Sequence, residues 1–105
     1  MTCIIVKEFE EGGQICVEVH GIGERDGAQL RIKSGESGGV LVANKDGDPR
    51  GLVAPRGSKL PTSKILSHLI ELKFCIVSQS SLVWPSSVIG NYEKTVTIWT
   101  LVKNT

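Results

Sequence analysis

The segment from Pro61 to Val102 constrains the fold of this chain more than any other part of it. Apolar residues recur at helical spacing between Thr62 and Lys73, which predicts a helix with one broad apolar face. That face consists of Ile65, Leu66, Leu69, Ile70 and Leu72. Two stretches rich in β-branched residues follow, from Phe74 to Trp84 and from Thr95 to Val102, and each predicts a strand. Because the helix must bury its apolar face against these strands, the segment indicates an α+β domain.

The final strand is the most regular, and its pattern extends back to Glu93. Apolar and β-branched residues occupy both of its faces, with Ile98 on one face and Trp99 on the other. Such a pattern is typical of a strand inside a sheet, or of one that a partner subunit covers. Pro85 is expected to end the preceding strand, because proline cannot donate a hydrogen bond to a neighbouring strand.

The first 43 residues predict a meander of up to four short strands without a helix. Cys3–Phe9 and Gln14–Ile22 flank a Gly-Gly pair and predict a β-hairpin. Gly21–Gly27 is polar and is expected to be a loop. Gln29–Lys33 alternates apolar and basic residues and predicts a third strand. Val40–Ala43 is wholly apolar and predicts a fourth strand, in the middle of a sheet. Residues 1–105 are therefore expected to form a single α+β domain, a small antiparallel sheet of about five to six strands with one main helix.

Composition excludes several classes of protein. The net charge of +1 provides no general attraction to nucleic acid, although the first 48 residues are acidic and the rest are basic. The three cysteines, Cys3, Cys16 and Cys75, lie far apart in apolar stretches, which predicts buried free thiols in a reducing, cytoplasmic compartment. No apolar run approaches the length of a membrane span, so no membrane association is expected.

No motif in the sequence indicates an enzyme, a metal site or a cofactor. His20 and His68 are isolated from other metal-ligating residues, and His68 falls on the polar side of the predicted helix, where it is expected to be exposed. Asp46-Gly47-Asp48 resembles the start of a calcium loop but lacks the later acidic ligand. The glycines of Gly21–Gly27 miss the dinucleotide fingerprint by one position.

The segment Pro49–Lys64 provides the physical case for a ligand site. It contains four cations and no acid, and two Pro-Arg-Gly triplets in which glycine lets backbone N–H groups approach an anion. The segment leads into the N-terminus of the predicted helix, which itself favours anions. Residues 52–54 within it predict a small strand or a packed plug. The candidate ligand-binding residues are Arg50, Gly51, Arg56, Gly57, Lys59 and Lys64. The alternative is a basic loop that binds no particular ligand.

Two functional hypotheses follow. The first is a non-catalytic binding or regulatory protein, a homo-oligomer that holds a small anionic ligand such as a nucleotide or an amino acid, or that modulates a partner protein. The second is a protein-interaction or inhibitor module, a viral or accessory factor that acts through its β-hairpin surface. Trp84, beside a proline, and Trp99, on the final strand, are the candidate interface residues because large aromatic side chains often anchor interfaces.

The C-terminal part of the chain also resembles a known family. The order of residues is similar to that in the C-terminal half of the GTP cyclohydrolase I feedback regulatory protein family. The similar positions are Ile65-Leu66, Leu69, Phe74, Val77-Ser78, Thr95-Val96, Trp99, Leu101 and Lys103. The resemblance covers about 40 residues, and the stretch Gln79–Glu93 is longer than the family's turn. It implies a small, non-enzymatic α+β protein that oligomerises and binds a small ligand at subunit interfaces.

Overall fold

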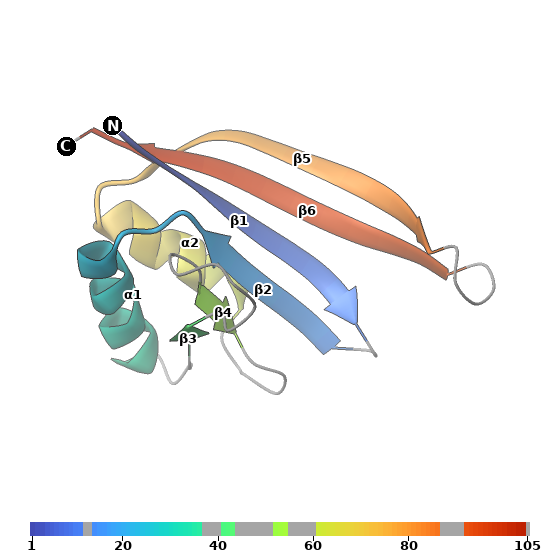
Figure 1. Cartoon of the computed structure of the whole chain (residues 1–105), viewed down its shortest axis with the longest axis horizontal. Helices are drawn as coiled ribbons and strands as arrows, with labels where there is room; N and C mark the ends of the chain where they lie inside the picture. Colours follow the sequence, from blue (N-terminus) through green and yellow to red (C-terminus); the bar gives the residue numbers. More distant parts are fainter. Residues whose placement is uncertain (12–13, 37–40, 44–51, 55–60, 87–91, 105) are drawn as a thin grey trace.

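The computed structural model of the protein describes residues 1–11, 14–36, 41–43, 52–54, 61–86 and 92–104 (Figure 1). Its strands are β1 (Thr2–Glu11), β2 (Gln14–His20), β3 (Val42–Ala43), β4 (Leu52–Ala54), β5 (Cys75–Ser86) and β6 (Tyr92–Lys103). Its helices are α1 (Glu24–Glu36) and α2 (Thr62–Glu71). The α+β class is confirmed. The expectation of one main helix is wrong, because the described residues contain two.

These six strands form one antiparallel sheet in the order β3-β4-β2-β1-β6-β5. β1 and β2 pair up to Glu11 and Gln14, which confirms the predicted hairpin. On its other side β1 pairs with β6, and Thr2 lies opposite Lys103, so the two ends of the chain meet (Figure 1). β6 therefore lies between β1 and β5, which confirms the interior position that was one of the two possibilities for this strand.

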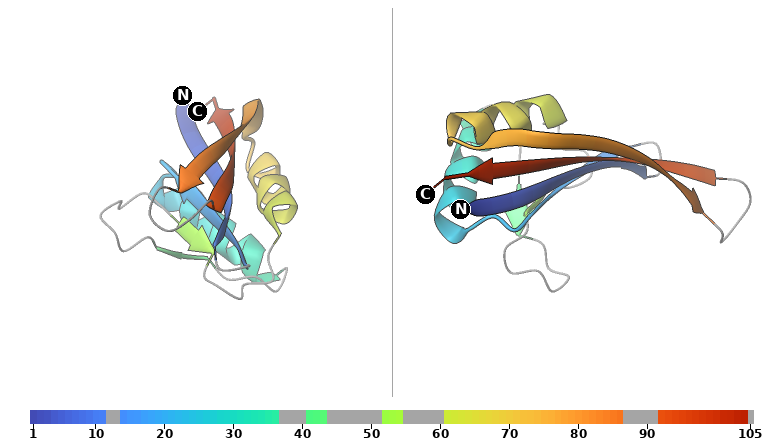
Figure 2. Two further views of the ribbon diagram at one scale, coloured as in Figure 1. Left: turned by 90° about the vertical axis from the view of Figure 1, so that its right-hand side faces the viewer. Right: turned by 90° about the horizontal axis from the view of Figure 1, so that it is seen from above.

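The sheet has one buried and one open face. Ile4 pairs with Leu101, and Val6 pairs with Val19, and all four side chains are fully buried. Ile5, between them on β1, points to the opposite face and is exposed. α1 and α2 cover the buried face (Figure 2). The helix residues that complete this core are Leu30, Ile65 and Leu69.

The helix α1 replaces the loop and the strand expected between Gly21 and Lys33. Leu30 and Ile32 alternate with basic residues as in a strand, but Leu30 is fully buried whereas Ile32 is exposed. The buried positions of α1 follow helical spacing, and two of the three hold small residues, Gly27 and Ser34. A helix that buries so few apolar side chains has no apolar stripe, which is why the pattern predicted a strand.

Gly21 provides the turn between β2 and α1. Its φ of +82° lies in the left-handed region, and a side chain there would place Cβ 3.1 Å from the Cys3 carbonyl oxygen. A helix does follow these glycines, contrary to expectation. Its flanking strands, β2 and β3, are not neighbours in the sheet, because β4 lies between them and pairs antiparallel with both. This is not the unit of two adjacent parallel strands that a dinucleotide fingerprint requires.

Three strands differ from their predicted form. β3 is a two-residue strand at one edge of the sheet, not in its middle, because β4 lies between it and β2. β4 confirms the small strand that was one of two possibilities for residues 52–54. β5 continues through Pro85, which an edge strand tolerates because its outer side has no neighbour that requires an N–H donor.

The cysteines are free, and Cys16 is buried as predicted, whereas Cys3 and Cys75 are exposed. The expectation of burial is wrong for these two because both pair with Val102 of β6, on the open face of the sheet rather than the buried face that holds Leu101. Neither of the described helices has the length and apolar character that crossing a membrane requires.

Candidate functional site

A cleft opens where the start of α1, the end of α2 and the end of β6 meet. Its volume is ≈ 440 Å³, within the range of small-molecule sites. We call it the charged cleft, and its lining residues are Arg25, Asp26, Gln29, Leu72 and Lys103. Three segments far apart in the sequence thus contribute to one concave surface.

Lys103 is fixed in the charged cleft by two contacts. Its Nζ lies 2.9 Å from Asp26 Oδ1 and 5.4 Å from the centre of the Phe74 ring. The side chains of Lys103 and Asp26 are only 20% and 19% exposed, so salt screens this pair less than a surface ion pair. An ammonium group has three N–H donors, and the described contacts use one of them as a hydrogen bond to a carboxylate. Donors therefore remain for a ligand.

Arg25 and Gln29 provide further donors from neighbouring turns of α1. Both side chains are exposed, and neither makes a hydrogen bond or ion pair within the described part of the chain. The guanidinium of Arg25 offers a planar pair of N–H groups that matches a carboxylate. With Asp26 balancing Lys103, the lining residues leave one net positive charge, on Arg25.

The backbone beside the charged cleft is strained at Lys73. Lys73 follows α2 with φ of 77°, a conformation in which glycine is normally found. Its N–H donates to the Ile70 carbonyl oxygen, and the Phe74 N–H donates to the Leu69 carbonyl oxygen, each at 3.0 Å. This is the Schellman arrangement that ends a helix, and it directs Phe74 into the core. Residues with strained backbones are concentrated at functional sites. Lys73 lies between Leu72, which lines the charged cleft, and Phe74, whose ring contacts Lys103 Nζ.

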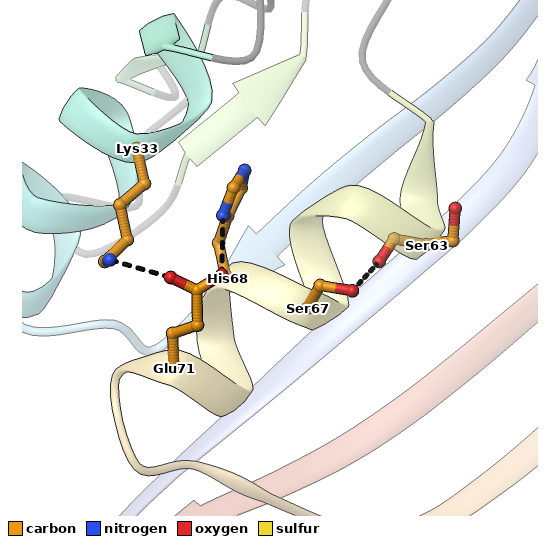
Figure 3. A network of polar contacts seen from close by, with 5 residues as sticks. All are labelled: Lys33, Ser63, Ser67, His68 and Glu71. Atoms are coloured by element: carbon orange, nitrogen blue, oxygen red, sulfur yellow. Dashed lines mark hydrogen bonds and ion pairs between the residues drawn. The ribbon is translucent and has the colours of Figure 1, made fainter.

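A second polar cluster joins the two helices near the same end of α2 (Figure 3). Glu71 accepts a hydrogen bond from Lys33 Nζ at 2.9 Å, and its other carboxylate oxygen lies 3.5 Å from His68 Nδ1. The hydrogen bond from Lys33, reinforced by its charge, lowers the pKa of Glu71, and the same bond raises the pKa of Lys33. Because α1 and α2 also pack together here, His68 is buried, and the expectation that it is exposed is wrong. The cluster thus connects α1 to the end of α2 that carries Leu72.

The predicted ligand site is described only at Lys64, which is exposed in the first turn of α2. The other five candidates, Arg50, Gly51, Arg56, Gly57 and Lys59, lie outside the described residues. At the start of α2, Thr62 Oγ1 donates a hydrogen bond of 2.7 Å to Glu8 Oε1, so a carboxylate of the protein itself approaches this helix terminus. Lys64 lies eight residues before Leu72, about 12 Å along the helix, and does not line the charged cleft.

The two predicted interface residues lie on the β5–β6 hairpin. Trp99 is half-buried and packs against the core on the helix-covered side of the sheet. Trp84 pairs with Lys94, beyond the last pair between β1 and β6, Phe9 with Val96. The end of the β5–β6 hairpin extends past the rest of the sheet (Figure 1).

Sequence reasoning missed the charged cleft because its residues come from three segments. Arg25 and Asp26 were assigned to a loop, and Lys103 follows the last apolar residue of the final strand. One signal was available: the acids Glu24 and Asp26 and the base Lys33 match the ends of a helix dipole over residues 24–36. No sequence signal places Lys103 beside that helix. Among the described residues, no three His, Cys, Asp or Glu side chains group together as metal ligands.

Comparison with known proteins identifies the fold but no function. No protein-family model and no curated protein matches the sequence. A crystal structure of a conserved kinetoplastid-specific protein from Trypanosoma cruzi is similar, with a TM-score of 0.60 and 13% sequence identity. The similarity covers 99% of this chain and 97% of that one. At this identity the similarity shows a shared fold alone. The resemblance to the GTP cyclohydrolase I feedback regulatory family stays a prediction.

Proposed function

We propose that this protein is a non-catalytic binding module that holds a small carboxylate ligand, best matched by a free amino acid, in the charged cleft. The observation that carries the proposal is the arrangement of Arg25 beside the Asp26–Lys103 ion pair. Arg25 is an exposed cation without a described partner, and it stands next to a cation and a carboxylate that are already held in place. Binding sites characteristically combine a few fixed polar groups with an apolar wall, here Leu72.

The lining groups complement both charges of an amino acid. Arg25 accommodates the α-carboxylate, with Gln29 and a remaining N–H of Lys103 as further donors. Asp26 uses Oδ1 for Lys103, so its Oδ2 is available to accept a hydrogen bond from the α-ammonium group. A nucleotide matches less well, since its phosphates carry several negative charges and the lining residues have only one net positive charge.

A ligand in this position would also act on the fold. It would contact the start of α1, the end of α2 and the end of β6 together, and so stabilise their mutual arrangement. A regulatory role requires this kind of coupling, because a ligand shifts a conformational equilibrium only through contacts that differ between the two states.

Thermal unfolding with a panel of amino acids and nucleotides tests the proposal. A ligand at ten times its Kd stabilises the folded state by about 1.4 kcal/mol, which for a chain of this size raises Tm by about 6–11 °C. We expect an amino acid to give such a shift and Arg25→Met to remove it. Lys64→Met is the matched control, because it deletes a cation of the originally predicted site outside the cleft, and it should leave the shift unchanged.

Two results would contradict the proposal. One is the absence of any amino-acid shift in the wild type. The other is a shift that survives Arg25→Met and disappears in Lys64→Met, which would place the ligand in the basic segment rather than in the charged cleft.

A further inference from the structure

We propose that the outer edge of β5 pairs antiparallel with β5 of a second copy of this chain, so that two sheets join into one. This inference concerns a surface separate from the charged cleft and goes beyond the proposed ligand function. β5 is the last strand of the sheet, and the described residues provide no strand beyond it. An unpaired edge of this length exposes a row of N–H and C=O groups that can pair with another strand.

β5 lacks the charges that usually prevent such pairing. Its sequence contains no Asp, Glu, Lys, Arg or His, and its described side chains, Cys75 to Ser81, are all exposed. Two other protective features lie toward its ends, a bulge between Ile76 and Ser78 and a proline at position 85. The run between them, from Ser78 to Trp84, is regular in register. A strand of about this length is typical of sheets in globular proteins.

The sequence of β5 matches its own reverse in polarity. Three apolar residues (75–77) precede four polar ones (78–81), and three apolar residues (82–84) follow. A two-fold axis perpendicular to the sheet through Ser80 places Ser80 opposite its own copy and Gln79 opposite Ser81 of the second chain. Beyond the polar centre, the bulge contributes one extra residue, so that Ile76 comes opposite Val83 and Cys75 opposite Trp84. Polar residues thus meet mostly polar ones, and apolar residues meet apolar ones.

This symmetry is the reason to favour a second copy over a foreign strand. A closed two-fold interface requires a self-complementary patch, and an uncharged strand with a near-symmetric polarity pattern meets that requirement. The axis keeps both helix layers on the same side of the joined sheet. Ser80 pairs with Ile98, five residues before Lys103, so the axis lies about 17 Å along β6 from the charged cleft. A strand pair alone makes a small interface, and we therefore expect a dimer that dissociates on dilution.

Sedimentation velocity over a concentration series tests the pairing. We expect the wild type to shift from monomer to dimer as its concentration rises. Ser80→Lys places two like charges directly opposite each other and should abolish the dimer, because such pairs destabilise a sheet. Ser80→Thr keeps the site neutral and suited to a strand, so it should retain the dimer. Ser67→Lys adds the same charge at an exposed position of α2 and should also retain it.

A cross-link identifies the register. In a Cys3→Ser, Cys75→Ser background, Ser80→Cys places two thiols across the axis with Cβ atoms about 4.5–5.5 Å apart, and mild oxidation should link them. Ser67→Cys in the same background should link far less. A monomer at every concentration, a dimer that Ser80→Lys leaves intact, or equal linking of the two cysteine variants would overturn the proposal. Each of these results is independent of whether an amino acid binds in the charged cleft.

Discussion

Replacing Lys73 by glycine is expected to stabilise the protein, although it removes a side chain and a charge. Lys73 occupies the position after α2 at which the backbone must turn into the left-handed region, with φ of 77°. In that conformation Cβ approaches the following carbonyl oxygen, which costs a residue other than glycine about 1–2 kcal/mol. The hydrogen bonds to the Ile70 and Leu69 carbonyl oxygens come from backbone N–H groups, so glycine preserves both.

The size of the effect follows from two opposing contributions. Relief of the left-handed strain favours the variant by about 1–2 kcal/mol. Glycine also loses more conformational freedom on folding, which opposes the gain by about 0.5–1 kcal/mol. The net stabilisation therefore lies between about 0 and 1.5 kcal/mol. Its centre, about 0.8 kcal/mol, raises Tm by about 3–6 °C for a chain of this length.

Urea unfolding followed by circular dichroism measures this change. Lys64→Gly is the matched control, because it also removes a lysine and introduces glycine, but within the helical conformation of α2. That variant should be less stable than the wild type by up to about 1 kcal/mol. If Lys73→Gly were destabilising to a similar extent, the strain assigned to the turn beside the charged cleft would be refuted.

Two further predictions concern α2. Leu69→Ala should destabilise the protein by about 2–5 kcal/mol because Leu69 is fully buried. Ile70→Ala, at a neighbouring position that is 52% exposed, should change stability by less than about 1 kcal/mol in the same urea assay. Equal effects of the two variants would show that the buried face of α2 is assigned wrongly. The folded state lowers the pKa of Glu71 from its ordinary value of 4.5. The ion pair of Glu71 with Lys33 therefore stabilises the folded state above pH 4.5, and this stabilisation is lost as the pH falls through the lowered pKa. Glu71→Gln should therefore reduce Tm near neutral pH and converge with the wild type in acid, and a Tm difference that persists unchanged into acid would contradict this assignment.

Much of the fold can be predicted from the sequence because apolar periodicity reports directly on burial. α2, β1, β2 and β6 all have such a pattern, and each lies close to its expected bounds. α1 does not, since its buried positions include Gly27 and Ser34, whose small side chains let the helix approach its neighbours without an apolar stripe. Its Leu30 and Ile32 then give a pattern of period two that by itself predicts a strand.

The charged cleft was much harder to predict because it depends on tertiary contacts. Arg25 and Asp26 are polar residues of an apparent loop, and Lys103 is a polar residue at the end of a strand. Only the pairing of β6 with β1, and the packing of both helices on one face, bring Lys103 next to Asp26. The basic segment gave the first hypothesis because its cations lie in one short stretch of sequence without an acid among them. Five of its six candidate residues lie outside the described part of the chain.

Amide and side-chain NMR spectra recorded during an amino-acid titration test the central claim most directly. The proposal predicts that one amino acid shifts the Arg25 Nε–H and Gln29 side-chain amide signals together with the backbone signals of Leu72 and Lys103. Arg25→Met should abolish these shifts while the remaining spectrum stays folded. Saturable shifts confined to the Lys64 end of α2, or no saturable shifts with any amino acid, would contradict the assignment of the charged cleft as a carboxylate-binding site.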